Sequence, residues 1–386
     1  MAEYKRLGDY IREVNVRNRE LKVTKLVGLT IDKAFIPSVA NVIGTDLSNY
    51  KVIRKEQFAC SLMQVSRDGK MPVAMFEEDE AIMSPAYPMF EVIDKTILMP
   101  QYLMMWFSRS EFDREASYYA VGGVRGSLTW EDFCNMRLPI PSITRQSEIV
   151  AEYETLTNRI RLNEQMIQKL EATAQALYRK TFVDNIDKEN LPEGWRMGTL
   201  GEVCEINTDN VSSKDKYNEI EYLDSSSVTE NKFDAYQHLV VGTDEIPSRA
   251  KRKVKINDIV YSTVRPNLKH YGIIKGDVGN VVVSTAFAVI RSNTSEISNE
   301  LLYLILTDEA VTEILQGIAE MSKATYPSIT PENIMELKVT LPQQIDNGFS
   351  ELNWSLKQLF DSIAIIHKEN LKLTELQSLL LAKMGQ

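Results

Sequence analysis

Basic residues gather in one short segment of this 386-residue chain. Between Glu245 and Lys275 the sequence holds eight lysines and arginines against two acidic residues. Such side chains can neutralise phosphate groups, whereas the net charge of −10 argues against a polyanionic partner. The two observations agree if charge is segregated along the chain. A local basic face on an acidic body is therefore compatible with the sequence.

Within this segment, the run from Ser248 to Lys255 places four basic residues in five positions. It could contact several phosphates, or it could be a solvated turn. Its candidates for DNA contact are Arg249, Lys251, Arg252 and Lys253.

Two equivalent strand-loop-strand segments offer side chains that can reach base edges as well as phosphates. In residues 261–272 an arginine precedes a proline, so we expect an extended backbone there. In residues 61–71 we expect a turn at Asp68-Gly69. The alternative is a pair of hairpins decorated for solubility. The candidates are Gln64, Arg67, Lys70, Arg265, Asn267 and Lys269.

A third pair of segments precedes the end of each half of the chain. Residues 118–128 form a glycine-rich loop, and glycine allows close backbone approach to a ligand. Residues 320–329 are its counterpart. As phosphate or base contacts we select Arg125, Ser127, Lys323 and Tyr326.

Catalytic and metal-binding motifs are missing from the sequence. The three cysteines and three histidines are scattered, so neither a disulfide framework nor a metal site is predicted. The motif of an adenine methyltransferase would contain a Pro-Pro pair, and the sequence has none. Gly69-Lys70 is followed by Met71, whereas a phosphate-binding loop has Ser or Thr at that position. The triplet Glu336-Leu337-Lys338 is interpreted as structural rather than as part of a nuclease site. We therefore predict a non-catalytic chain without a cofactor.

The sequence segments expected to form the helices and strands that position these residues occur twice, at an offset of roughly 200 residues. Leu7-Gly8-Asp9 is echoed by Leu200-Gly201-Glu202. The segments IRKEQFACS and SPAYPMFEV of the first half match VKINDIVYS and STAFAVI of the second. Each half then closes with a threonine that starts a helix, Thr129 or Thr330, and a strand that ends at proline. The repeating unit is a mixed α/β domain followed by a long helix.

Both helices have apolar residues at alternating steps of four and three, as in a coiled-coil seam. An antiparallel register with Asn163 opposite Asn370 brings the other seam residues into pairs, so we predict that the two helices pair within one chain. The alternative is two unrelated helices, each packed on its own domain. The first seam consists of Ile149, Tyr153, Leu156, Ile160, Asn163, Ile167, Leu170, Ala174 and Leu177; the second consists of Phe349, Leu352, Leu356, Leu359, Ile363, Ile366, Asn370, Leu373, Gln377 and Leu380.

Over essentially its whole length the chain resembles the specificity subunits of type I restriction-modification enzymes. The features that carry the resemblance are the duplicated domain-helix plan, the LPEGW entry at Leu191 and the RLPIPSITRQSEI junction at Arg137. The second junction, LKVTLPQQIDNGF at Leu337, lacks the second proline and the isoleucine-valine helix start.

The resemblance implies two target-recognition domains, at residues 1–141 and 187–342, and two spacer helices, at 142–186 and 343–386, related by a pseudo-twofold axis. Each domain would read one half of a split site on double-stranded DNA. The helices would set the spacing and dock two modification subunits, which methylate adenine with S-adenosylmethionine. Restriction subunits would use ATP and magnesium.

We expect a cytoplasmic protein, because the sequence has neither a signal peptide nor a run of ~20 apolar residues that could cross a membrane. Two other functions stay open. A coiled-coil scaffold would show no sequence-selective DNA binding, and a self-contained nuclease would cleave DNA without partners.

Overall fold

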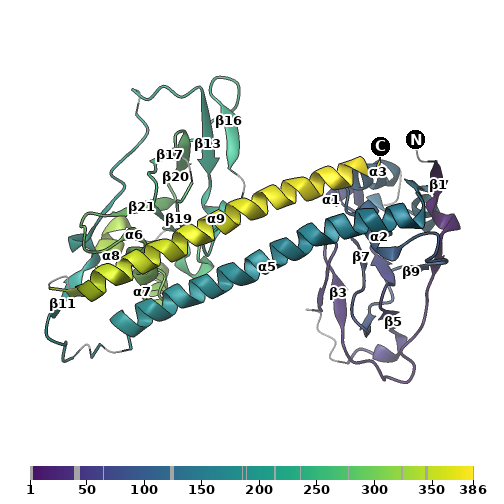
Figure 1. Ribbon diagram of the computed structural model, residues 1–386, viewed down its shortest axis with the longest axis horizontal. Coiled ribbons are helices and arrows are strands. Elements are labelled where there is room, and N and C mark those ends of the chain that lie inside the picture. Colours follow the sequence, from purple (N-terminus) through teal and green to yellow (C-terminus); the bar gives the residue numbers. More distant parts are fainter. Residues whose placement is uncertain are drawn as a thin grey trace. The chain divides into compact units, whose positions relative to one another are not determined.

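The computed structural model describes residues 3–38, 44–63, 65–121, 126–184, 186–187, 189–212, 214–234, 236–276, 278–322, 325–343 and 347–385. The chain divides into two compact units (Figure 1). The first contains Met1–Leu162 and Asn370–Gln386, and the second contains Asn163–Glu369. Both boundaries fall inside long helices.

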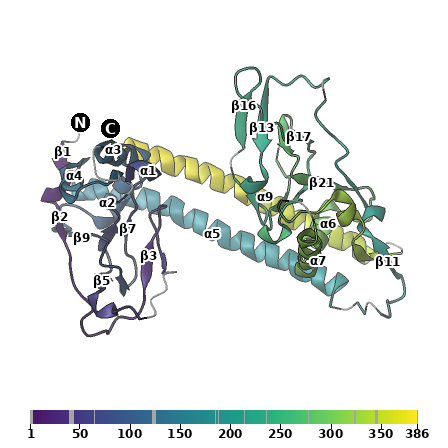
Figure 2. The ribbon, with the colours of Figure 1, turned by 180° about the vertical axis from the view of Figure 1, so that it is seen from behind.

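The first unit is built on a four-stranded antiparallel sheet in the order β2-β9-β6-β7. Three helices pack on one face, and the aromatic rings of Phe58, Phe90 and Phe133 meet in that layer. Figure 2 shows this unit from behind. The sheet strands are β2 (Ile11–Glu13), β6 (Phe58–Cys60), β7 (Val73–Met75) and β9 (Met89–Val92), and the helices are α2 (Pro100–Phe107), α3 (Ser110–Ala120) and α4 (Trp130–Asn135).

Further strands complete the first unit. Leu26 forms a parallel bridge with Ile82, which joins the β3-β4 pair to the β5-β8 pair. At the other end of the domain, β1 pairs with β10. The bounds are β1 (Tyr4–Arg6), β3 (Val27–Leu29), β4 (Phe35–Pro37), β5 (Lys51–Arg54), β8 (Glu80–Met83) and β10 (Arg137–Pro139); a short helix α1 (Val65–Asp68) lies between β6 and β7.

The second unit repeats this topology. Its central sheet has the order β12-β21-β18-β19, and its second sheet has the order β16-β13-β20-β17. The central strands are β12 (Cys204–Ile206), β18 (Ile259–Ser262), β19 (Tyr271–Ile273) and β21 (Phe287–Ser292). The remaining elements are β11 (Trp195–Thr199), β13 (Glu219–Leu223), β14 (Val228–Thr229), β15 (Lys232–Phe233), β16 (Gln237–Val240), β17 (Ala250–Lys253), β20 (Val281–Ser284), β22 (Lys338–Pro342), α6 (Asn299–Leu306), α7 (Glu309–Glu320) and α8 (Pro331–Met335).

Alternation along the central strands separates the two faces of each central sheet. In β18, Ile259 and Tyr261 pack against helices, whereas Val260 packs against the second sheet. In β6, Phe58 packs against helices and Ala59 against the second group of strands. Both units therefore consist of a helical layer, a central sheet and a second layer of strands.

The predicted repeat is confirmed in its details. Leu7-Gly8-Asp9 and Leu200-Gly201-Glu202 both form 3-10 turns, labelled η1 and η4. A Cβ atom on Gly8 would lie 2.8 Å from the Cβ of Cys134, and one on Gly201 would lie 3.1 Å from that of Met335. Glycine recurs at this step because the turn approaches the closing helix too closely for a larger residue.

The predicted helix starts at Thr129 and Thr330 are also confirmed. Each threonine is the N-cap of the closing helix, α4 or α8, and forms a reciprocal capping box. The partner is the residue three positions on, Asp132 or Asn333, rather than the acidic residue two positions on.

The two long helices are α5 (Ile143–Phe182) and α9 (Asn347–Lys383). α5 begins one residue after the predicted start of the first spacer helix at residue 142, and both predicted seams lie within the helices. Every seam residue is buried or half-buried. The predicted arrangement of two long antiparallel helices with mixed α/β domains is confirmed.

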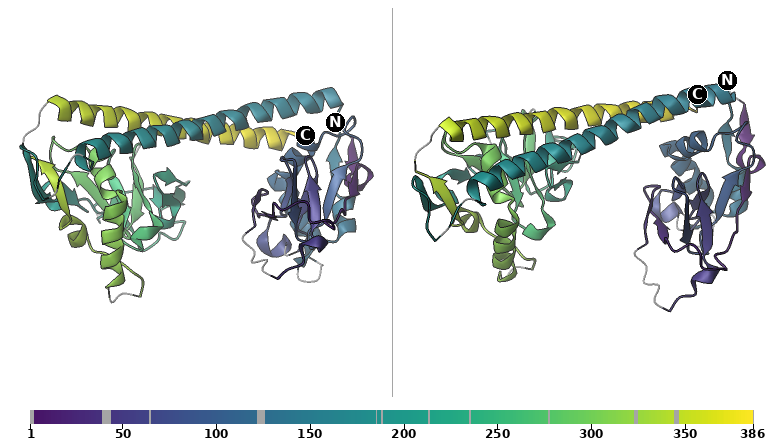
Figure 3. Two further views of the ribbon diagram at one scale, coloured as in Figure 1. Left: turned by 90° about the horizontal axis from the view of Figure 1, so that it is seen from below. Right: turned by 60° about the horizontal axis from the view of Figure 1, so that its bottom comes forward.

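Contacts inside each unit show that the helices run in opposite directions (Figure 3). In the second unit, the ring of Phe182 at the end of α5 lies 5.7 Å from that of Phe349 at the start of α9. Asn163 is 6% exposed and donates to Glu369 at 3.0 Å. In the first unit, Gln377 donates to Thr157 at 2.7 Å.

One local prediction was wrong. Arg265 is not extended: its φ of 50° and ψ of 68° place it in the left-handed region, where its N–H donates to the carbonyl of Pro327 at 2.9 Å. At this position the contact with a distant segment outweighs the local preference of the sequence. The turn predicted at Asp68-Gly69 is present: Gly69, with φ of 66°, is a turn residue directly after the short helix α1.

Candidate nucleic-acid interface

Two segments that the sequence offered separately meet in the second unit. Thr263 accepts a hydrogen bond from the N–H of Ile329 at 2.9 Å, and Arg265 donates its N–H to Pro327 at 2.9 Å. These bonds place Tyr326 beside the loop after β18. The guanidinium of Arg265 lies 4.9 Å from the centre of the Tyr326 ring. Both side chains are exposed.

Arg249 is tied to the same end of the sheet through the turn between β20 and β21. Its carbonyl accepts from the N–H of Thr285 at 2.9 Å, and the next residue, Ala286, accepts from the N–H of Thr263 at 2.8 Å. Arg249 and Lys251 are exposed and form no ion pair with another described residue. They are therefore available for phosphate contacts.

Other basic residues of the run are engaged inside the domain. β17 is a strand rather than a solvated turn, and its pairing with β20 has a register irregularity between Ala250 and Arg252. Lys253 pairs with Asp215 at 2.5 Å, and this hydrogen bond, with others from Ser212, lowers the pKa of Asp215 to about 2. Arg252 donates to Asn210 at 2.7 Å.

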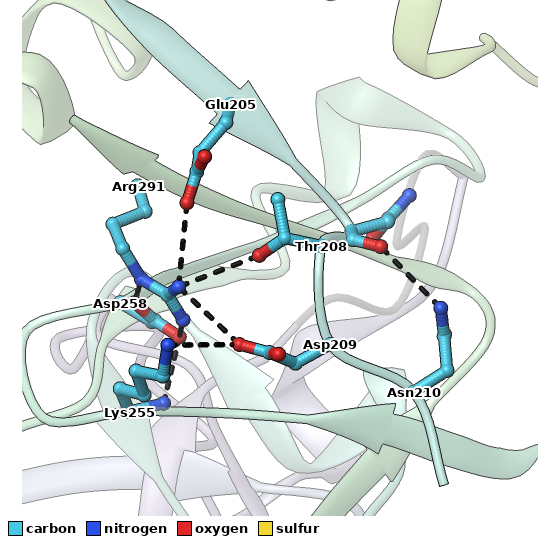
Figure 4. A network of polar contacts seen from close by, with 8 residues as sticks. Glu205, Thr208, Asp209, Asn210, Lys255, Asp258 and Arg291 are labelled. Carbon is cyan, nitrogen blue, oxygen red and sulfur yellow. Dashed lines mark hydrogen bonds and ion pairs between the residues drawn. The ribbon is translucent and has the colours of Figure 1, made fainter. Parts of the chain in front are cut away.

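A polar network that includes Lys255, two residues after β17, also pairs basic side chains with carboxylates (Figure 4). Asp258 is fully buried and receives two hydrogen bonds of 2.6 Å from Arg291. Arg291 also lies 3.4 Å from Glu205 and from Asp209, and the latter pairs with Lys255 at 3.0 Å. Both cations of this network are paired with carboxylates inside the domain, so its role is structural.

The loop between β18 and β19 presents its candidates unequally. Lys269 pairs with Glu309 at 3.1 Å and lies 3.7 Å from Glu230; its pKa is raised, first by the hydrogen bond to Glu309. The side chain of Asn267 is exposed, while its backbone N–H donates to Gln316 at 3.2 Å. The side chain of Lys269 is thus less available for DNA contact than that of Asn267.

In the first unit, the equivalent segments also come together. The N–H of Leu128 donates to the carbonyl of Leu62 at 2.8 Å, which places Ser127 near the helix α1. Arg67 is exposed and pairs with the adjacent Asp68 at 2.7 Å. Lys70 pairs with Asp32 at 3.1 Å on the surface. Gln64, Arg125 and Lys323 lie outside the described residues.

Exposed apolar side chains on the long helices were not selected from the sequence. On α9, Trp354 is 65% exposed and Ile365 is 69% exposed, and both belong to the second unit. In the first unit, Leu371 and Leu379 of the same helix are 60% and 58% exposed. All four lie outside the predicted seam. An apolar residue of the helix that does not belong to the seam could therefore have been identified from the sequence as a surface residue.

The described residues contain no group of His, Cys, Asp and Glu arranged to hold a metal ion. All three cysteines are buried, and burial raises the pKa of the Cys204 thiol to about 12. Within the described ranges, no helix has the length and apolar character required to cross a membrane.

Comparison with known proteins defines the class to which this fold belongs. Residues 192–375 match the family described as the type I restriction modification DNA specificity domain. A solved type I restriction-modification S subunit from M. genitalium has the same fold, with a TM-score of 0.61 at 12% identity; the match covers 100% of this chain and 96% of that one.

The sequence is also 29% identical over 185 residues to the type I restriction enzyme HindI specificity subunit of Haemophilus influenzae. That match covers 44% of this chain and 39% of the relative, so it spans about two fifths of the relative's length. Residues 192–375 are therefore similar to the DNA specificity domain of type I restriction-modification systems, and part of the chain is similar to a specificity subunit.

Proposed function

We propose that this chain reads a split DNA sequence, with one half-site for each α/β domain. The observation that carries the proposal is the duplication itself: the same strand order occurs twice, with different side chains on equivalent loops. One loop pair presents Arg265 and Tyr326, whereas the other presents Arg67 and Ser127. Two domains of one topology with different contacts suit two half-sites of different sequence. The recognised site is therefore asymmetric.

The recognition domains are proposed to comprise residues 1–141 and 187–342, with spacer helices at 142–186 and 343–386. The helices would set the distance between half-sites and dock two modification subunits. Support for docking comes from the large exposed side chains of Trp354 and Ile365 in the second unit and of Leu371 and Leu379 in the first. A contiguous exposed apolar patch marks a protein contact, and these four side chains are the candidates for such a patch on α9.

The chemistry is assigned to partners rather than to this chain. The modification subunits would methylate adenine with S-adenosylmethionine, and restriction subunits would use ATP and magnesium. This chain would supply sequence specificity alone and would act in the cytoplasm. It would bind DNA weakly by itself, because its net charge of −10 gives little electrostatic attraction.

A protein scaffold is the second candidate function, and the exposed apolar residues of α9 favour it equally. The two functions differ in one respect: a scaffold would bind the modification subunit without adding sequence-selective DNA contacts. Trp354→Ala should weaken binding of the modification subunit under either function, so this variant tests docking only.

The deciding experiment maps adenine methylation across the genome of a host that carries the cognate modification gene, with and without this chain. We expect methylation at one asymmetric bipartite motif only when the chain is present. Exchange of residues 1–141 for those of a relative should change one half of the motif and leave the other. Active modification subunits without a chain-dependent motif would reject DNA reading and leave the scaffold.

A further inference from the structure

The loop from Arg265 to Lys269 combines exposure with a constrained backbone. Arg265 and Lys269 both adopt left-handed conformations, with φ of 50° and 55°. Between them lies the 3-10 turn η6 (Pro266–Leu268), whose proline is buried. Positive φ values are uncommon outside glycine, and they persist where surrounding contacts hold them, often at binding sites.

Contacts on several sides hold the backbone of this loop in place. The N–H of Arg265 donates to Pro327 at 2.9 Å, and that of Asn267 donates to Gln316 on α7 at 3.2 Å. Lys269 is bound to Glu309, also on α7, at 3.1 Å. The loop is therefore a rigid platform that projects the side chains of its remaining residues.

The side chain of Arg265 is oriented by an aromatic ring rather than by an acid. Its guanidinium lies 4.9 Å from the ring centre of Tyr326, which is itself 56% exposed. Arg265 forms no ion pair with any described residue. A ring face restricts the guanidinium without using its N–H donors, which stay free for a ligand.

The surroundings favour a base edge over a phosphate as that ligand. The carboxylates of Glu309 and Glu230 hold Lys269, four residues after Arg265 in the same loop, and they would repel an approaching phosphate. A neutral base edge meets no such repulsion. Guanine presents two neighbouring acceptors, N7 and O6, in the major groove, and these match two N–H groups of one guanidinium.

We propose that Arg265, held over Tyr326, reads a guanine in the half-site of the second domain through paired hydrogen bonds to N7 and O6. This inference rests on the proposed function and adds to it one base and the residue that selects it. Tyr326 acts as a positioning residue, because it orients the guanidinium.

The test uses the full chain in complex with its modification subunit and maps the methylated motif for each variant. Arg265→Lys keeps the charge but loses the planar fork. Arg265→Gly removes the side chain and relieves the left-handed backbone, so it should fold at least as well as the parent, as thermal unfolding can verify. Both should lose discrimination for guanine at a single position by about 5- to 150-fold.

Two further variants complete the design. Tyr326→Phe keeps the ring and should keep the motif, whereas Tyr326→Ala should reduce discrimination at the same position as Arg265→Lys. Arg196→Lys is the matched control, because Arg196 is a half-buried arginine of β11 that pairs with Glu202. It should leave the motif unchanged.

The inference is overturned if Arg265→Lys keeps full guanine discrimination, or if the relaxed position is not a G·C pair. A motif that depends on the chain but not on Arg265 would reject this inference and leave the proposed function intact. A motif that does not depend on the chain would reject both.

Discussion

An ion triad with two buried members attaches α9 to the second domain, and removal of its cation should destabilise that domain strongly. Lys275 follows β19 and lies 2.5 Å from Glu300 on α6 and 2.9 Å from Asp361 on α9. The side chains of Lys275 and Glu300 are 9% and 4% exposed, whereas that of Asp361 is 42% exposed. Lys275→Met therefore leaves the Glu300 carboxylate buried without its cation.

The expected cost of Lys275→Met is about 3–5 kcal/mol in the free energy of unfolding, the usual range for breaking a buried pair by removal of one partner. The ion pair with Asp361 contributes little to the free energy of unfolding, because water can reach Asp361. Replacing both buried partners, as in Lys275→Met with Glu300→Met, removes the uncompensated charge and should cost less than the single change.

Urea unfolding of the full chain, with hydrogen exchange of α6 and β19 peptides to localise the effect, measures this cost. Lys372→Met is the control, because Lys372 forms a surface pair with Glu375 at 2.9 Å and both side chains are more than 60% exposed. That pair should contribute no more than about 1 kcal/mol. The reasoning fails if Lys275→Met costs no more than Lys372→Met, or if the double variant is the least stable.

Three further results are expected. Thr129→Ala and Thr330→Ala should each cost about 0.5–2 kcal/mol, because each removes an N-cap, and thermal unfolding would show no loss if the capping boxes were unimportant. The pKa of Asp215 is lowered to about 2 from 3.8, so its contribution to stability is present above about pH 4 and is lost as the pH falls through 2. Asp215→Asn should remove that part of the acid dependence of stability, as urea midpoints measured over a pH series would show. Arg249→Ala and Lys251→Ala should each lower the slope of log K against log salt by about 0.9 per phosphate contact in anisotropy titrations of the complex, and unchanged slopes would exclude phosphate contacts there.

Much of the fold could be predicted from sequence because its signals are local or periodic. The repeat was visible in order and spacing, and the structure shows why individual residues recur: Gly8 and Gly201 each face a closing helix at short range. The seams were readable because a helix buries every third or fourth residue. The strand order was not readable, since pairing between strands depends on contacts distant in sequence.

The candidate site was likewise predictable from the sequence only in part. From the sequence alone came the basic run, the loop residues and the caps, because residue type and spacing are enough to indicate them. Only the tertiary structure decided which charges are free: it pairs Lys253 with Asp215 and Lys269 with Glu309, and it leaves Arg249 without an ion pair among the described residues. It also placed Arg265 in a left-handed conformation against Tyr326. Charge density is a property of the chain, whereas the partner of each charge depends on which distant residues folding brings within reach.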